Sequence, residues 1–392
     1  MKQSNIKKPL STFLVASFLL SGCGLFEDTD PATDSENDSS TTENSTMNNG
    51  DSTSEDMTEE DQADKADKDE TQNDIDQDLT VWFPKVEDTL LDYEGDGNEF
   101  SPFTRYPQFV KDDSMQMVES TAGTDVVTVY DYSDDEIRER FVRPETYFRD
   151  DFVDTGLESE QDDFLILLQK PLEKGHSWES PDGSTSEITD VAIDKELPFG
   201  TVKAIEVTRQ YDSDSETVDY YGKDIGLIEQ VFKTAENDYT VTSTLSTQSK
   251  DTPETFPLTV YSVDDQALGL DKTSVTMELY TNEPARLAMA DILKGQAPDT
   301  EGAQALKDST EINFMYLRQD GIVHVDFSTD LSAMNAGAGI EAMTLQGIVN
   351  TIGDYYNVEE VLLTLDNEPY ESGHILLEEG ETWSVDYSNV NE

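Results

Sequence analysis

The chain has 392 residues and a formal net charge of −61, with 86 Asp and Glu against 25 Lys and Arg. A chain this acidic lacks the basic footprint that phosphate contacts require, which excludes nucleic acid as a partner. Hydrophobic residues make up only 35% of the chain, so we expect part of it not to fold. Cys23 is the single cysteine, which excludes an intrachain disulfide and a cysteine-built metal site.

The N-terminus is organised like an export signal. Three lysines precede a largely apolar run, Leu10–Leu20, that is too short to cross a bilayer as a helix. The run ends in Leu20-Ser21-Gly22-Cys23, which resembles the lipobox of bacterial lipoproteins. That resemblance implies a signal peptide over residues 1–22 and lipid attachment to Cys23, which would hold the protein on the extracytoplasmic side of the cell membrane. An ordinary secretory signal with a chance cysteine is the alternative.

Residues 23–78 consist mostly of Asp, Glu, Ser, Thr and Asn. This composition offers too few apolar side chains to build a core. We therefore expect a disordered acidic linker between the lipidated N-terminus and the folded part.

From residue 79 to residue 250 apolar and polar residues alternate, as they do in strands with one buried face. Turn signals such as Asp182-Gly183 and Gly222 separate the runs. We expect an antiparallel β domain with a strongly curved sheet, in which the one candidate helix lies at Asp134–Phe141. The predicted strands are Val126–Tyr130, Phe164–Leu168, Ile188–Ile193, Val202–Val207, Asp219–Tyr221, Leu227–Phe232 and Tyr239–Leu245.

A polar segment around Pro253 leads into residues 255–392, where strands and helices are mixed. Two runs, Thr281–Gly295 and Ile340–Tyr355, have apolar residues at helical spacing. Strands interrupted by two helices predict a sandwich with helices on one sheet face, so the fold class expected for the chain is α+β. The predicted strands are Leu258–Val263, Val275–Tyr280, Ile312–Leu317, Ile322–Phe327 and Val361–Leu365.

Residues 255–392 resemble the GerMN domain family, a module of sporulation and spore-germination lipoproteins. The most specific segments are Leu293-Lys294-Gly295, Val325–Ser328, Ile348–Thr351 and Gly373-His374. The resemblance implies an α+β module that helps to build or support envelope complexes, and therefore an envelope protein as partner. The first half of the chain does not match this pattern, and we find no internal repeat.

No set of residues has the pattern of an active site, so we expect neither catalysis nor a cofactor. His176, His324 and His374 are far apart in sequence, and no Gly-x-Ser-x-Gly elbow accompanies them. The same separation argues against a zinc site. Asp92–Asn98 begins like a calcium loop, but Phe103 replaces the Glu that such a loop needs. We interpret it as a turn, with weak cation binding as the alternative.

Two functional hypotheses follow. The first is a non-catalytic assembly component of the envelope, linked to sporulation or spore germination. The second is a lipoprotein that binds an envelope glycan or peptide in a groove lined by aromatic residues, although core packing and cross-strand pairing would explain the same residues. The aromatic residues concerned are Tyr130, Tyr132, Tyr147, Phe148, Tyr220 and Tyr221.

Overall fold

The computed structural model describes residues 75–97, 102–153, 163–211, 215–234, 239–300 and 303–391. The export signal, Cys23 and most of the predicted linker lie outside the described residues. Residues 75–78, at the end of the predicted linker, lie against the sheet. The Trp82 indole donates to the Asp76 carbonyl (2.9 Å), and Ile75 packs on the core. Residues 71–392 cluster into one unit.

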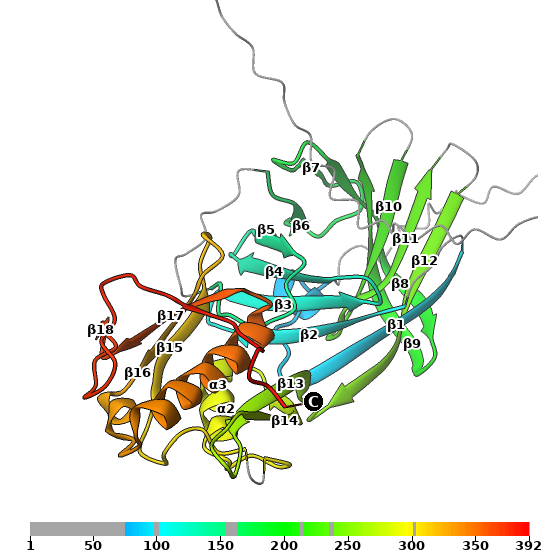
Figure 1. Cartoon of the computed structure of the whole chain (residues 1–392). Helices are drawn as coiled ribbons and strands as arrows, with labels where there is room; N and C mark the ends of the chain where they lie inside the picture. The colour runs from blue at the N-terminus through cyan, green and yellow to red at the C-terminus, as the bar shows by residue number, and fades with distance from the viewer. Residues whose placement is uncertain are drawn as a thin grey trace, which may run out of the picture. The chain divides into compact units, whose positions relative to one another are not determined.

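The larger sheet has twelve antiparallel strands, which are β1 (Thr89–Gly97), β2 (Phe103–Val110), β3 (Ser114–Thr121), β4 (Asp125–Tyr132), β5 (Glu136–Pro144), β6 (Ile166–Gln169), β7 (Ser177–Glu179), β8 (Thr185–Leu197), β9 (Gly200–Gln210), β10 (Ser215–Gly222), β11 (Gly226–Thr234) and β12 (Tyr239–Lys250). They are ordered β6-β5-β4-β3-β2-β1-β12-β11-β10-β9-β8-β7, as Figure 1 shows. Strands adjacent in the chain pair with one another, except that β6 and β7 form the two edges and β1 pairs with β12.

The two edges of this sheet meet through side chains rather than a ladder. The Trp178 indole donates to the Ile166 carbonyl (3.0 Å), and the Ile166 N–H donates to Ser180 Oγ (3.1 Å). These contacts satisfy edge groups that would otherwise need another strand. The sheet is therefore nearly closed.

The two faces of the sheet are used differently, because successive side chains along a strand point to opposite sides. On the inner face Met115 and Tyr130 pack with the short helix α1 (Leu79–Trp82). On the outer face Val118 and Val127 pack against residues of the C-terminal part. The sheet and the C-terminal part therefore share one hydrophobic core.

The C-terminal module, residues 254–391, contains β13 (Glu254–Val263), β14 (Leu270–Leu279), α2 (Ala285–Leu293), β15 (Ile312–Leu317), β16 (Val323–Phe327), the 3-10 helix η1 (Thr329–Ala333), α3 (Ala338–Tyr356), β17 (Glu360–Leu365), β18 (Glu368–Pro369) and β19 (Trp383–Ser384). β13 and β14 form a hairpin, and the other five strands form a second sheet. In that sheet β16 and β17 are parallel and joined through α3, the crossover that a parallel pair requires. None of the helices in the described residues has the length and hydrophobicity that a membrane crossing needs.

The predicted α+β fold class is wrong, because the described part of the chain is mostly β, with 49% of its residues in strands and 13% in helices. The strands β1 to β3 were not predicted at all. The candidate helix at Asp134–Phe141 is the strand β5. Ile137 and Phe141 have helical spacing, but a bulge at Arg140 turns them to opposite faces of the sheet. The two helices predicted in the C-terminal module are present as α2 and α3.

Candidate functional site

The three histidines occupy unrelated places in the fold. His324 lies on β16 and stacks on Tyr316 with 5.8 Å between ring centroids, and partial burial lowers its pKa. His176 packs beside Trp178 just before β7, and His374 is exposed near the C-terminus. Over the described ranges, no group of three His, Cys, Asp or Glu side chains could hold a metal ion.

The segment that resembles a calcium loop is part of a strand. Asp92–Gly97 pairs with β12, so its interpretation as a turn was wrong, and Asn98 lies outside the described residues. The backbone is extended by the ladder and cannot wrap around an ion as an EF-hand loop does.

The aromatic residues proposed for a groove do not lie together on one open surface. Tyr130 and Tyr221 are buried on the inner face, and Phe148 is buried in the core shared with the C-terminal module. Tyr220 lies beneath the Lys195 ammonium (3.7 Å to the ring centroid), whereas Tyr147 is 49% exposed. This placement removes the aromatic groove as the basis for a binding role.

The inner face of the twelve-stranded sheet carries two ion pairs, one buried (Arg209–Asp219) and one partly exposed (Arg105–Glu119). Arg105 on β2 and Glu119 on β3 are cross-strand neighbours whose Nη2 and Oε2 atoms lie 2.7 Å apart. Arg209 on β9 forms an ion pair with Asp219, which lies diagonally across the ladder on β10. Gln230 Nε2 also donates to Asp219 (2.8 Å). Charges inside a sheet are stable only when each is paired, as these four are.

A fifth charged residue, Glu139 on β5, lies on this inner face next to Tyr130 in the β4–β5 ladder. Burial raises the pKa of its carboxyl to about 7, while the charges of Arg209 and Arg105 oppose that shift. We call these five residues the interior charged cluster: Arg105, Glu119, Glu139, Arg209 and Asp219.

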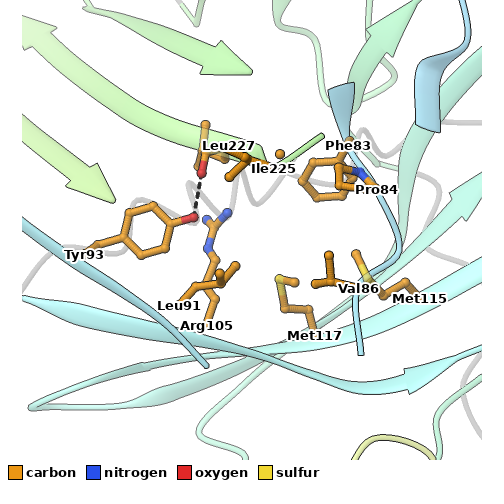
Figure 2. A pocket seen from close by; sticks show the side chains of 11 residues that line it. Phe83, Pro84, Val86, Leu91, Tyr93, Arg105, Met115, Met117, Ile225 and Leu227 are labelled. Carbon is orange, nitrogen blue, oxygen red and sulfur yellow. Dashed lines mark hydrogen bonds between the residues drawn. The ribbon is translucent and has the colours of Figure 1, made fainter. Parts of the chain in front are cut away.

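Beside Arg105 the inner face has a small hollow with a volume of about 10 Å³ (Figure 2). Figure 2 shows the Arg105 guanidinium next to Tyr93, whose hydroxyl donates to the Leu227 carbonyl (2.7 Å). The rest of the lining is apolar. A cavity needs about 10–15 Å³ to hold one water molecule, so this hollow has room for about one water.

A second polar site joins the sheet to the C-terminal module through Arg149, which follows β5 and is 1% exposed. Its guanidinium donates to the carbonyls of Gln108 on β2, Leu279 on β14 (3.2 Å) and Tyr280 (2.8 Å). Glu254 at the start of β13 lies 3.4 Å from it. Burial raises the pKa of Glu254 to about 7, and the Arg149 charge opposes that shift. One side chain therefore connects both parts of the unit.

The next residue, Asp150, binds the module from the same loop and is 5% exposed. Its carboxylate accepts from the Leu317 N–H at the end of β15 (3.0 Å) and from the Tyr356 hydroxyl at the end of α3 (2.8 Å). The Arg149 N–H donates to the Tyr355 hydroxyl (2.9 Å). We call Arg149, Asp150 and Glu254 with these partners the junction network.

Neither the interior charged cluster nor the junction network was predicted from the sequence. The cluster joins residues from strands far apart in the chain, and no local pattern marks it. The junction does have a local signal, because Arg149, Asp150 and Asp151 stand between Phe148 and Phe152. Charges enclosed by two core aromatics are typical of a buried polar contact.

The family comparison concerns the C-terminal module. Residues 259–371 match the model of the family described as Germane, sporulation and spore germination. The segments that carried the resemblance have structural roles here: Asn350 and Thr351 are fully buried on α3, and Asp326 on β16 accepts from the Thr364 hydroxyl (2.6 Å). Comparison with curated protein sequences gives no match.

Several solved structures share local similarity with the chain. The tandem GerMN domains of the sporulation protein GerM from Bacillus subtilis are 16% identical, with a TM-score of 0.24, over 32% of this chain and 45% of that one. The first GerMN domain of the same protein is 17% identical, with a TM-score of 0.25, over 31% of this chain and 94% of that one. A Bacteroides fragilis protein with a YmcC-like fold is 10% identical, with a TM-score of 0.28, over 43% and 99%.

The chain therefore spans less than half the length of the tandem GerM structure that it matches. TM-scores of this size do not establish a common overall fold. The similarity to the Germane family therefore concerns residues 259–371 alone.

Proposed function

We propose that this chain is a lipid-anchored, non-catalytic assembly component of the cell envelope that acts in sporulation or spore germination. The premise is that residues 259–371 form a GerMN-type module. The match to a family described by those two processes is the observation that carries the proposal. Lipid attachment at Cys23 would place the protein on the extracytoplasmic side of the membrane. The acidic segment between Cys23 and residue 75 would then separate the folded unit from the bilayer.

The junction network supports a mechanical role for the sheet in this proposal. Arg149 and Asp150 bind carbonyl, amide and hydroxyl groups of the module from a loop of the sheet. Buried polar contacts of this kind are costly to break, because each separated group would lose its partner. The sheet then acts as a support that holds the module in a fixed orientation for a partner protein in the envelope.

The alternative of a glycan- or peptide-binding lipoprotein has less support. The tyrosines and phenylalanines that suggested it are mostly placed in cores or in cross-strand pairs. An enzymatic role is likewise unsupported by the described residues, where the three histidines occupy separate elements.

The proposal is tested by photo-crosslinking in living cells. A photoreactive amino acid is introduced singly at Leu287 on α2 or at Leu376 near the C-terminus, which are exposed apolar positions of the module. Phe199, exposed in the β8–β9 turn of the sheet, is the matched control. We expect both module positions to crosslink to the same envelope protein and Phe199 not to do so.

The anchor is tested in the same cells by fractionation. Cys23→Ser should release the protein from the membrane fraction and abolish the crosslinks, whereas Ser4→Ala, outside the lipobox, should change neither. Membrane retention of Cys23→Ser would contradict the lipid anchor. The absence of any protein crosslink from both module positions would contradict the assembly role.

A further inference from the structure

One edge of the strand β14 is open. Among the described residues β14 forms a ladder with β13 alone, without a bulge, and the C-terminal residues 389–391 bind only Leu270 at its start. Backbone groups alternate sides along a strand, so every second residue after Leu270 also directs its N–H and C=O away from β13. These residues, which we call the β14 edge, are Lys272, Ser274, Thr276 and Glu278.

The backbone of the β14 edge has no partner. No hydrogen bond joins its outward N–H and C=O groups to any residue that the structure describes, and its four side chains are exposed. The other long strand edges of the described part are covered: Trp178 joins β6 to β7, and Thr351 of α3 binds β13. On β15 the backbone is bound by Asp150 and Arg286. An edge without proline, bulge or cover is a template for another strand.

The β14 edge carries opposite charges at its two ends. Lys272 lies near the start of the strand and Glu278 near its end. When a second copy of β14 runs antiparallel about a two-fold axis at Val275, Lys272 of each copy faces Glu278 of the other. Ser274 then faces Thr276. Opposite charges that face each other across an antiparallel pair are favourable, so the edge is complementary to itself, as a two-fold interface requires.

We propose that two copies of this chain bind each other through the β14 edge, so that their β13–β14 hairpins form one four-stranded antiparallel sheet. The edge residues of each copy exchange backbone hydrogen bonds with those of the other. Residues 272–278 contain one Lys and one Glu, so this strand has no net charge although the whole chain carries −61. The more distant repulsion is screened at about 0.15 M salt, where the Debye length is about 8 Å.

This proposal goes beyond the assembly role and does not depend on it. The occupant of the β14 edge is a second copy of the chain, whereas the assembly role requires a different envelope protein. Self-association can therefore fail while the role in sporulation or germination holds, and the reverse is equally true.

The first test removes a backbone donor from the edge. Thr276→Pro deletes an N–H that points away from β13, so the ladder within the hairpin is kept. Sedimentation equilibrium of the full chain in a density-matched detergent, at about 0.15 M NaCl, measures self-association. We expect the wild type to dimerise reversibly and Thr276→Pro to dimerise about thirtyfold more weakly, because each dimer loses two hydrogen bonds. Thr276→Ser, which keeps the N–H, should behave like the wild type.

The second test exchanges the charges and reports the register. Lys272→Glu and Glu278→Lys each place like charges opposite one another twice in the dimer, so each should weaken self-association about tenfold. The double variant has the wild-type net charge and should restore it. A mixture of the two single variants should form heterodimers, because every Glu then faces a Lys. Glu94→Lys, at an exposed position of β1, changes the net charge as Glu278→Lys does and should not weaken association.

A chain that stays monomeric into the millimolar range would overturn the proposal. A dimer that neither Thr276→Pro nor the two single charge variants weaken would do so too, because its interface would lie elsewhere. If Thr276→Pro does not fold, the charge variants decide, since both positions are exposed. A photoreactive amino acid at Ser274 that crosslinks only to a different protein would contradict the second copy as the occupant.

Discussion

At the junction, Asp150 can form hydrogen bonds both as an ionised carboxylate and as a protonated acid. As a carboxylate it accepts from the Leu317 N–H and from the Tyr356 hydroxyl, which also lies 3.3 Å from the Met315 carbonyl. When protonated, Asp150 can donate to the Tyr356 oxygen, and Tyr356 can then donate to Met315. Burial raises the pKa of Asp150 to about 7, while the Leu317 and Tyr356 hydrogen bonds oppose that shift, so the protonated state is favoured below neutral pH.

Asp150→Asn should remove part of the pH dependence of stability. The pKa of Asp150 in the folded protein lies above its ordinary value of 3.8, so the folded protein binds more protons. The resulting stabilisation is lost as pH rises from about 4 to about 7. Asn imitates the protonated acid and does not titrate. Between about pH 5 and about pH 8 the wild type should lose about 2–3 kcal/mol of unfolding free energy that the variant retains. Urea unfolding followed by tryptophan fluorescence measures the difference.

Two further variants control this prediction. Asp112→Asn, at an exposed position in the β2–β3 turn, should keep the wild-type slope. Asp150→Ala leaves the Leu317 N–H buried without a partner, so it should be about 1–3 kcal/mol less stable than Asp150→Asn at both pH values. Equal slopes for the wild type and Asp150→Asn would mean that Asp150 is ionised throughout, contrary to the prediction.

At the scale of elements, α3 approaches the hairpin of the module unusually closely. Thr351 Oγ1 accepts from the Tyr261 N–H on β13 (3.0 Å), one turn after Gly347. A Cβ at Gly347 would lie 2.4 Å from the Tyr261 carbonyl oxygen, so glycine is required there by contact and not by backbone angle. Near the start of the same helix, a Cβ at Gly339 would meet open space.

Gly347→Ala should therefore destabilise the protein by about 1–3 kcal/mol, because the helix must move away from β13. Gly339→Ala should instead stabilise it by up to about 1 kcal/mol, because alanine has the higher helix propensity. Chemical unfolding of the two variants provides the comparison. A neutral Gly347→Ala would contradict the close approach of α3 to β13.

An element of this fold could be predicted when its residue pattern lies within a short stretch of the sequence. The helix α3 was predicted because Leu345, Ile348, Val349 and Ile352 form one apolar stripe within a few turns. The strands β1 to β3 were missed because polar residues, among them the buried Gln116, occupy positions that face the module. Bulges in β2 and β5 also shift the alternation on which a strand is recognised. The α+β class failed for these reasons.

At the scale of the whole molecule, the sheet and the module behave as parts of one core. Phe141 of the sheet and Phe256 and Leu345 of the module belong to the same buried cluster, which the junction network borders. No local sequence pattern indicates this shared core, because each half of the chain has its own strand and helix pattern. An anchor before the sheet would therefore carry the module with it, which is what the assembly role requires.

The most direct test of that role is the heat-resistant spore count, with the germination rate, of a strain lacking this gene compared with its parent. The account predicts a large drop in the deletion strain, restoration by the wild-type gene and no restoration by Cys23→Ser. A spore count and germination rate equal to those of the parent would contradict it, and so would a source organism that forms no spores.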